Sequence, residues 1–172
     1  MNVHDAMRLQ VAHNRWINRH LHEICDQLSD DERKRDLGAF FGSIHGTFNH
    51  LLLVDRLWMG RLTDQPFHVN SLAQELYTDW EELKRERARA AADLKRFVHS
   101  LDEKALDRPV SYRNTRGRQR AFSVGTILTH LFHHQTHHRG QITVLIGQLG
   151  HDFGETDLIG MPGVACRVGN DD

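Results

Sequence analysis

The sequence has few cysteines and no long apolar run. Its two cysteines, Cys25 and Cys166, stand far apart and form no CxxC pair, which argues against a disulfide framework or a thiolate zinc site. No stretch approaches the roughly 18 apolar residues that a membrane span needs, and the first ten residues lack the apolar core of a signal peptide. We therefore expect a cytoplasmic protein that is neither secreted nor inserted into a membrane.

An excess of charge of one sign is also absent. Lys and Arg total 22 against 23 Asp and Glu, which gives a formal net charge of -1. Nucleic-acid-binding domains usually carry a strongly basic surface, so we expect no nucleic-acid partner. The 172 residues are within the size of one ordinary domain and are enough to bury a hydrophobic core. Residues 1–172 are therefore predicted to form a single domain.

Proline is scarce, and its three positions lie outside four long stretches with helical spacing of apolar residues. The predicted helices span about 3–28, 39–62, 71–101 and 123–149. The third is expected to open after Asn70 or Ser71, and the last to begin at a Ser123 cap and stop at Gly150. Between 107 and 122 the period changes and predicts a short β-hairpin around a Gly turn, while 151–172 resembles a tail lying on the body. The fold class is all-α, a four-helix bundle with a β-hairpin before the last helix.

Histidine is abundant: the chain has 14, where an even share among the residue types would give about nine. The last predicted helix contains two i, i+4 pairs, His133 with His137 and His134 with His138, and such pairs can chelate a metal. At about 100° per residue, His138 lies roughly 30° and His134 roughly 70° from the centre of the apolar face. His137 and His133 lie roughly 130° and 170° away. His134 and His138 are therefore predicted to point into the bundle.

A single inward histidine is more often a satisfied core residue than a ligand. Two of them one turn apart favour a metal site, because buried imidazoles without partners would leave ring nitrogens unsatisfied. The HExxH form of zinc proteases needs Glu after the first His, and Gln135 stands there instead. The pattern therefore predicts metal binding without the metalloprotease arrangement.

The second predicted helix offers two candidates for a third ligand, His45 and His50. Both lie about 105° to 115° from the centre of its apolar face, on opposite sides, so the periodicity does not decide between them. Asp55 projects into the core and needs a partner there. That partner is either the metal site, through a bound water or a His N–H, or Arg87 on the third helix in a structural salt bridge.

Three segments resemble the DinB/YfiT-like family. They read NRWIN at 14–18, IHGTFNHLLLVDRLW at 44–58 and HLFHHQTHHRGQ at 130–141. The resemblance covers nearly the whole chain and implies an up-down-down-up four-helix bundle. It also implies that His50, His134 and His138 hold one divalent metal, most often zinc or nickel, and that the protein is a homodimer. Some relatives are thiol-dependent enzymes such as bacillithiol transferases, and the family name refers to a damage-inducible gene.

These observations lead to one main functional hypothesis and two alternatives. Three neutral imidazoles leave a divalent ion an open coordination position, which is typical of catalytic sites. The main hypothesis is a metal-dependent hydrolase or thiol transferase that activates water or a low-molecular-weight thiol against a small-molecule substrate. Asp55 and Gln141 are candidates for orienting ligands or handling protons, and Arg87 for binding an anionic substrate. The alternatives are a non-catalytic metal-binding stress-response protein and a dimeric scaffold.

Overall fold

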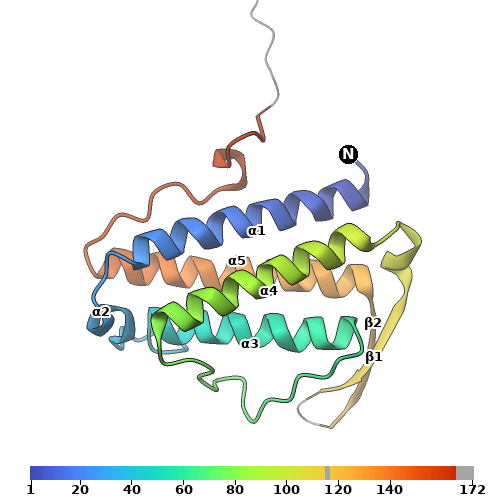
Figure 1. Cartoon of the computed structure of the whole chain (residues 1–172), viewed down its shortest axis with the longest axis horizontal. Coiled ribbons are helices and arrows are strands. Elements are labelled where there is room, and N and C mark those ends of the chain that lie inside the picture. Colours follow the sequence, from blue (N-terminus) through green and yellow to red (C-terminus); the bar gives the residue numbers. More distant parts are fainter. Residues whose placement is uncertain (115–116, 166–172) are drawn as a thin grey trace, which may run out of the picture.

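Four long helices, each begun by a side-chain cap, make up most of the structure. The computed structural model describes residues 1–114 and 117–165 (Figure 1). At the start of each long helix, the cap side chain accepts a hydrogen bond from the backbone N–H three residues further on, and such caps fix where a helix begins. The caps are Asn2, Ser43, Asp79 and Ser123, and the helices are α1 (Val3–Cys25), α3 (Ile44–Leu62), α4 (Trp80–Ser100) and α5 (Val124–Gln148).

The four helices form the expected up-down-down-up bundle. α1 and α5 run in one direction, and α3 and α4 run in the other (Figure 1). Because α3 and α4 point the same way, the chain must return along the bundle between them, and residues 63–79 make this connection. Within the described residues, no helix is long and apolar enough to cross a bilayer.

The interior consists of two apolar clusters and a set of buried polar side chains. One cluster contains Phe48, Trp80 and Ile146, and the other contains Leu53 and Leu131. Along α5 the buried polar residues Gln135, His138 and Arg139 fall between the members of the two clusters. Buried polar groups are stable when they have hydrogen-bond partners. Six buried polar side chains, each at most 5% exposed, bond to one another: Asn14, Asn18, Asp55, Arg87, Gln135 and Arg139.

Two predicted helix boundaries differ from the structure. α3 begins at Ile44, because residues 39–42 form a tight turn in which Gly42 has a φ of 73°. α4 begins at Trp80, well after the expected cap at Asn70 or Ser71, and residues 71–79 instead form part of the connection. α5 does begin after Ser123, as predicted, and Gly150 follows its end with a φ of 84°.

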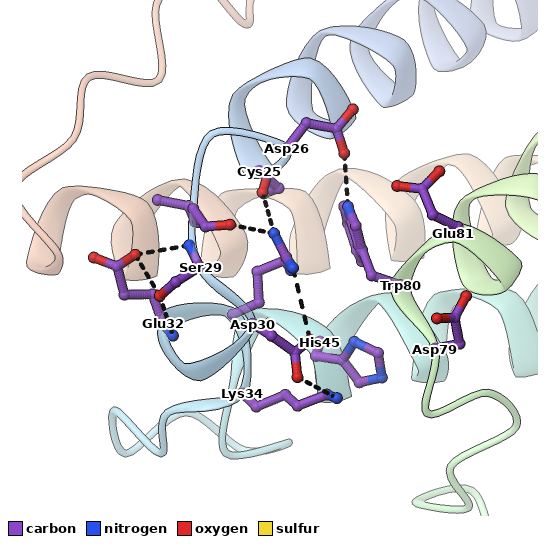
Figure 2. Close-up of polar contacts among 12 residues, drawn as sticks. Cys25, Asp26, Ser29, Asp30, Glu32, Lys34, His45, Asp79, Trp80 and Glu81 are labelled. Atoms are coloured by element: carbon purple, nitrogen blue, oxygen red, sulfur yellow. Dashed lines mark hydrogen bonds and ion pairs between the residues drawn. The ribbon is translucent and has the colours of Figure 1, made fainter.

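A short helix, α2 (Asp30–Lys34), occupies the polar cluster where the first helix was expected to stop (Figure 2). It begins with a capping box, in which the Ser29 hydroxyl accepts from the backbone of Glu32 and the Glu32 carboxylate accepts from the backbone of Ser29. Arg33 then donates to the carbonyl oxygens of Cys25 and Leu28 at the end of α1. These bonds satisfy carbonyls that a helix end leaves unpaired.

The hairpin and the C-terminal segment lie on the outside of the bundle. A one-turn helix η1 (Lys104–Asp107) leads into strands β1 (Pro109–Arg113) and β2 (Gln119–Ser123), which pair antiparallel as predicted. After α5 the chain follows α1, where His20 Nε2 lies 2.8 Å from the carbonyl oxygen of Phe153, and forms a last turn η2 (Leu158–Gly160). The described residues leave out part of the expected hairpin turn, 115–116, and part of the expected tail, 166–172, which contains Cys166.

Candidate metal centre

Three histidine rings from two helices converge on one point. His50 comes from the middle of α3, and His134 and His138 lie one turn apart on α5. The Nε2 atom of His134 lies 3.1 Å from Nε2 of His50 and 3.1 Å from Nε2 of His138. One nitrogen from each ring lies within 4.8 Å of the other two, so the cluster could hold a metal ion.

In two of these rings, His50 and His138, the other ring nitrogen Nδ1 lies against a carbonyl oxygen. His50 Nδ1 lies 2.9 Å from the backbone oxygen of Leu72, in the connection between α3 and α4. His138 Nδ1 lies 2.7 Å from Oε1 of Gln141, one turn further along α5. A carbonyl oxygen only accepts hydrogen bonds, so both Nδ1 atoms must carry the proton. The Nε2 atoms of His50 and His138 therefore present bare lone pairs to the centre of the cluster.

The surroundings keep these imidazoles uncharged at neutral pH. Burial, together with the neighbouring His138 and His50, lowers the pKa of His134 to about 3. Burial likewise lowers the pKa of His50 to about 4. The pKa of His138 is also lowered, again mainly by burial. Neutral imidazole is the form that binds metals, so all three ligand atoms are available at pH 7 without a proton having to leave.

The proton arrangement fits a cation better than an empty cluster. His134 Nε2 can carry at most one proton, which it can donate to His50 or to His138. The Nε2 lone pair at the other short contact would then lie 3.1 Å from the same nitrogen with no proton to accept. A positive ion between the three Nε2 atoms would accept all three lone pairs, so the donor set matches a divalent metal. The proton of His134 would then lie on Nδ1, which is buried without a hydrogen-bond partner among the described residues.

Phe41 covers the cluster from the loop before α3. Its ring stacks on His50 with centroids 3.8 Å apart and meets His138 edge-on at 5.5 Å. This contact and the Leu72 carbonyl were not predicted. A backbone oxygen leaves no mark in a sequence, and Phe41 was assigned to a helix that begins only at Ile44.

Among the described residues, the other candidate histidines are not part of the ligand cluster. His45 is buried at the start of α3 (Figure 2), where its Nε2 lies 2.8 Å from the carbonyl oxygen of Tyr77. His133 and His137 are exposed, in agreement with the helical angles, whereas His138 is buried and His134 half-buried. The structure thus brings together the three histidines that the resemblance implied. The other three are outside this ligand group, although the His137 ring meets His138 edge-on with centroids 4.8 Å apart.

Asp55 belongs to the buried polar network of the core. Arg87 Nη1 donates to its Oδ2 at 2.7 Å, and Gln135 Nε2 donates to its Oδ1 at 2.6 Å. Arg87 also donates to Asn18 Oδ1 at 3.2 Å. Of the two partners considered for this carboxylate, the structure shows the ion pair with Arg87. A role for Asp55 in proton handling stays a prediction.

Gln141 is placed to orient His138, and this placement leads to a test. We expect Gln141→Leu to weaken metal binding about 10- to 100-fold, because such losses are typical when the partner that orients a ligand is removed. Gln141→Glu keeps an acceptor for His138 Nδ1 and is expected to retain affinity. Competition against a chromophoric chelator measures both affinities. Gln148→Leu, an exposed change at the end of α5, is the matched control, and an equal loss there would refute the orienting role.

Comparisons with known proteins agree with this fold. The sequence profile of the DinB family matches residues 1–165. Protein DinB of Bacillus subtilis (strain 168) is 24% identical over 149 residues, which cover 84% of this chain and 87% of that protein. A DinB-like protein from Bacillus cereus ATCC 10987 superposes with a TM-score of 0.58 at 18% identity, over 78% of this chain and 86% of that one, and shares its fold. The expected relationship is confirmed, and this chain belongs to the DinB family.

Proposed function

We propose that this chain is a metal-dependent enzyme that activates water or a low-molecular-weight thiol against a small electrophilic substrate. The single observation that carries the proposal is the convergence of three neutral donors, from His50, His134 and His138, within the described part of the chain. Structural metal sites usually supply four protein ligands, whereas catalytic sites supply three and leave a position open. A divalent ion held by these three histidines, zinc or nickel in this proposal, would lower the pKa of water or of a thiol bound to it.

The protein side chains fix the geometry of this site. The Leu72 carbonyl and Gln141 hold the Nδ1–H groups of His50 and His138, so each ring presents Nε2 to the same point. Phe41 stacks on His50 and limits the access of bulk water from that side. Cys25 does not supply the thiol, because burial raises its pKa to about 12. Cys25 is the only cysteine among the described residues, so we propose that the nucleophilic thiol comes from a small molecule. The homodimer expected from the family stays a prediction.

Cobalt substitution tests the proposal directly. Protein purified without a histidine tag is loaded with Co²⁺, whose visible spectrum reports its ligands, and is titrated with cysteine and with glutathione. We expect a saturable spectral change and a new sulfur-to-cobalt charge-transfer band if a thiol is the activated group. For the hydrolytic form of the proposal, a pH titration without thiol should show one transition near neutrality. A spectrum that responds neither to thiols nor to pH would contradict the enzyme and favour a closed, non-catalytic metal site.

A further inference from the structure

A groove of about 550 Å³ runs between α1 and α4, away from the histidine cluster. It lies within the range of small-molecule binding sites, which is roughly 300–1,000 Å³. Trp16 and small residues of both helices contribute apolar surface, while Arg8, Arg15, Arg19 and Lys95 contribute cationic side chains. α1 and α4 run antiparallel here (Figure 1), so the two helices place charges along both sides of the groove.

The exposed and half-buried cations of this groove lack acidic partners among the described residues. None of Arg8, Arg15, Arg19 and Lys95 forms an ion pair within 4.0 Å with any residue in the described part of the chain. Two acidic residues line the groove, Glu23 and Asp26. Asp26 already accepts from the Trp80 ring nitrogen (Figure 2) and also from Lys84. A protein with a formal charge of -1 therefore concentrates unpaired positive charge at one place.

The buried wall of the groove adds unsatisfied nitrogen atoms. Arg87 is only 1% exposed, and its two terminal nitrogens bond to Asp55 and Asn18. Its Nε, however, has no hydrogen-bond partner among the described residues, and the same is true of His22 Nε2. Both residues line the groove. A buried donor without an acceptor is unfavourable, so a ligand oxygen that reaches this wall would gain a hydrogen bond there.

One end of the groove shows direct crowding of positive charge. His99 lines it beside Arg8 and Lys95. Burial lowers the pKa of the His99 ring, and the charges of Arg8, Lys95 and His4 lower it further. Groups that repel one another's charge in this way are stabilised by a bound anion.

We infer that the α1–α4 groove binds a small organic anion with two acidic groups, carboxylate or phosphate, joined by a short apolar body. One acidic group pairs with Arg8 and Lys95, and the other with Arg15 and Arg19. Trp16 packs against the body. The site is distinct from the histidine cluster and does not depend on the proposed enzymatic activity.

Calorimetric titration of the full-length protein with glutarate and with pyrophosphate tests this inference. We expect saturable binding of at least one probe at one molecule per chain, weakened by added salt and accompanied by a change in tryptophan fluorescence. The double variant Arg8→Ala/Lys95→Ala should weaken binding at least about tenfold, since two charge-assisted contacts are lost. Arg120→Ala, an exposed arginine of β2, is the matched control and should bind as the unmodified protein does.

Three outcomes would overturn the inference. The first is no saturable binding of either probe, and the second is an equal loss in Arg120→Ala and in the double variant. The third is loss of binding in His138→Ala with none in the double variant, which would place the anion at the histidine cluster. If sedimentation shows a dimer that the double variant dissociates and neither probe binds, the groove is an interface between two copies instead.

Discussion

His138→Ala is expected to abolish stoichiometric metal binding, whereas His133→Ala leaves it intact. His138 supplies one of three convergent Nε2 atoms, and its loss leaves two donors and a hole beneath Phe41. His133 is exposed on the other face of α5 and contributes nothing to the cluster. Elemental analysis of protein purified without a histidine tag, after dialysis against metal-free buffer, gives the metal content per chain.

The two variants differ by five positions on the same helix, so each controls for the other. Circular dichroism should show the same helix content in both, because neither change removes a large apolar side chain from the core. Equal loss of metal in both would mean that the wrong face of α5 was assigned. Retention of a full equivalent in His138→Ala would remove the cluster as a metal site and the proposed enzyme with it.

Arg87→Met is expected to lower the free energy of unfolding by about 3–5 kcal/mol, the usual cost of breaking a buried ion pair on one side. The side chain of Arg87 is fully buried, and its loss leaves the carboxylate of Asp55 and the oxygen of Asn18 without their donor. Urea denaturation measures the difference. Arg85→Met, at an exposed ion pair on the same helix, is the control and should change stability by less than about 1 kcal/mol.

The cost of Arg87→Met should also depend on pH. Burial raises the pKa of the Asp55 carboxyl, and without Arg87 only the smaller effects of Gln135 and Arg139 oppose this shift. The folded variant then holds a proton that the unfolded chain releases above about pH 4, so its stability falls as the pH rises. We expect a larger destabilisation at pH 8 than at pH 5. The double variant Arg87→Met/Asp55→Leu should recover much of the loss, and a loss no greater than in Arg85→Met would contradict the role of the pair.

The sequence predicted the long helices well, because caps and apolar periodicity are local signals. Ser123 begins α5 and Gly150 follows its end as expected. The start of α4 was wrong because residues 71–79 contain a cap-like Ser71 and apolar residues at helical spacing. In the structure, Asn49 accepts from the backbone of Leu76 and Tyr77 and donates to the carbonyl of Tyr77. These contacts from α3 hold the segment out of a helix, and a helix pattern cannot report them.

The histidine cluster was predictable only in part. Helical angles separated inward His138 from outward His133, because α5 is long and its apolar face is well defined. The same method could not choose between His45 and His50, which flank the apolar face of α3. The choice depends on the connection between α3 and α4: the carbonyl of Tyr77 meets His45, and the carbonyl of Leu72 meets His50.

Because Leu72 lies in an irregular segment, one ligand of the cluster is oriented by a part of the chain that has no helix of its own. Ion binding and the ordering of residues 72–77 must then be thermodynamically linked, since whatever stabilises one stabilises the other. Loading the ion should slow hydrogen exchange at the backbone amides of Leu76 and Tyr77, far along the chain from α5. Conversely, a substrate that displaces this segment would weaken metal binding without contacting the ion, because His50 would lose the Leu72 carbonyl that orients it.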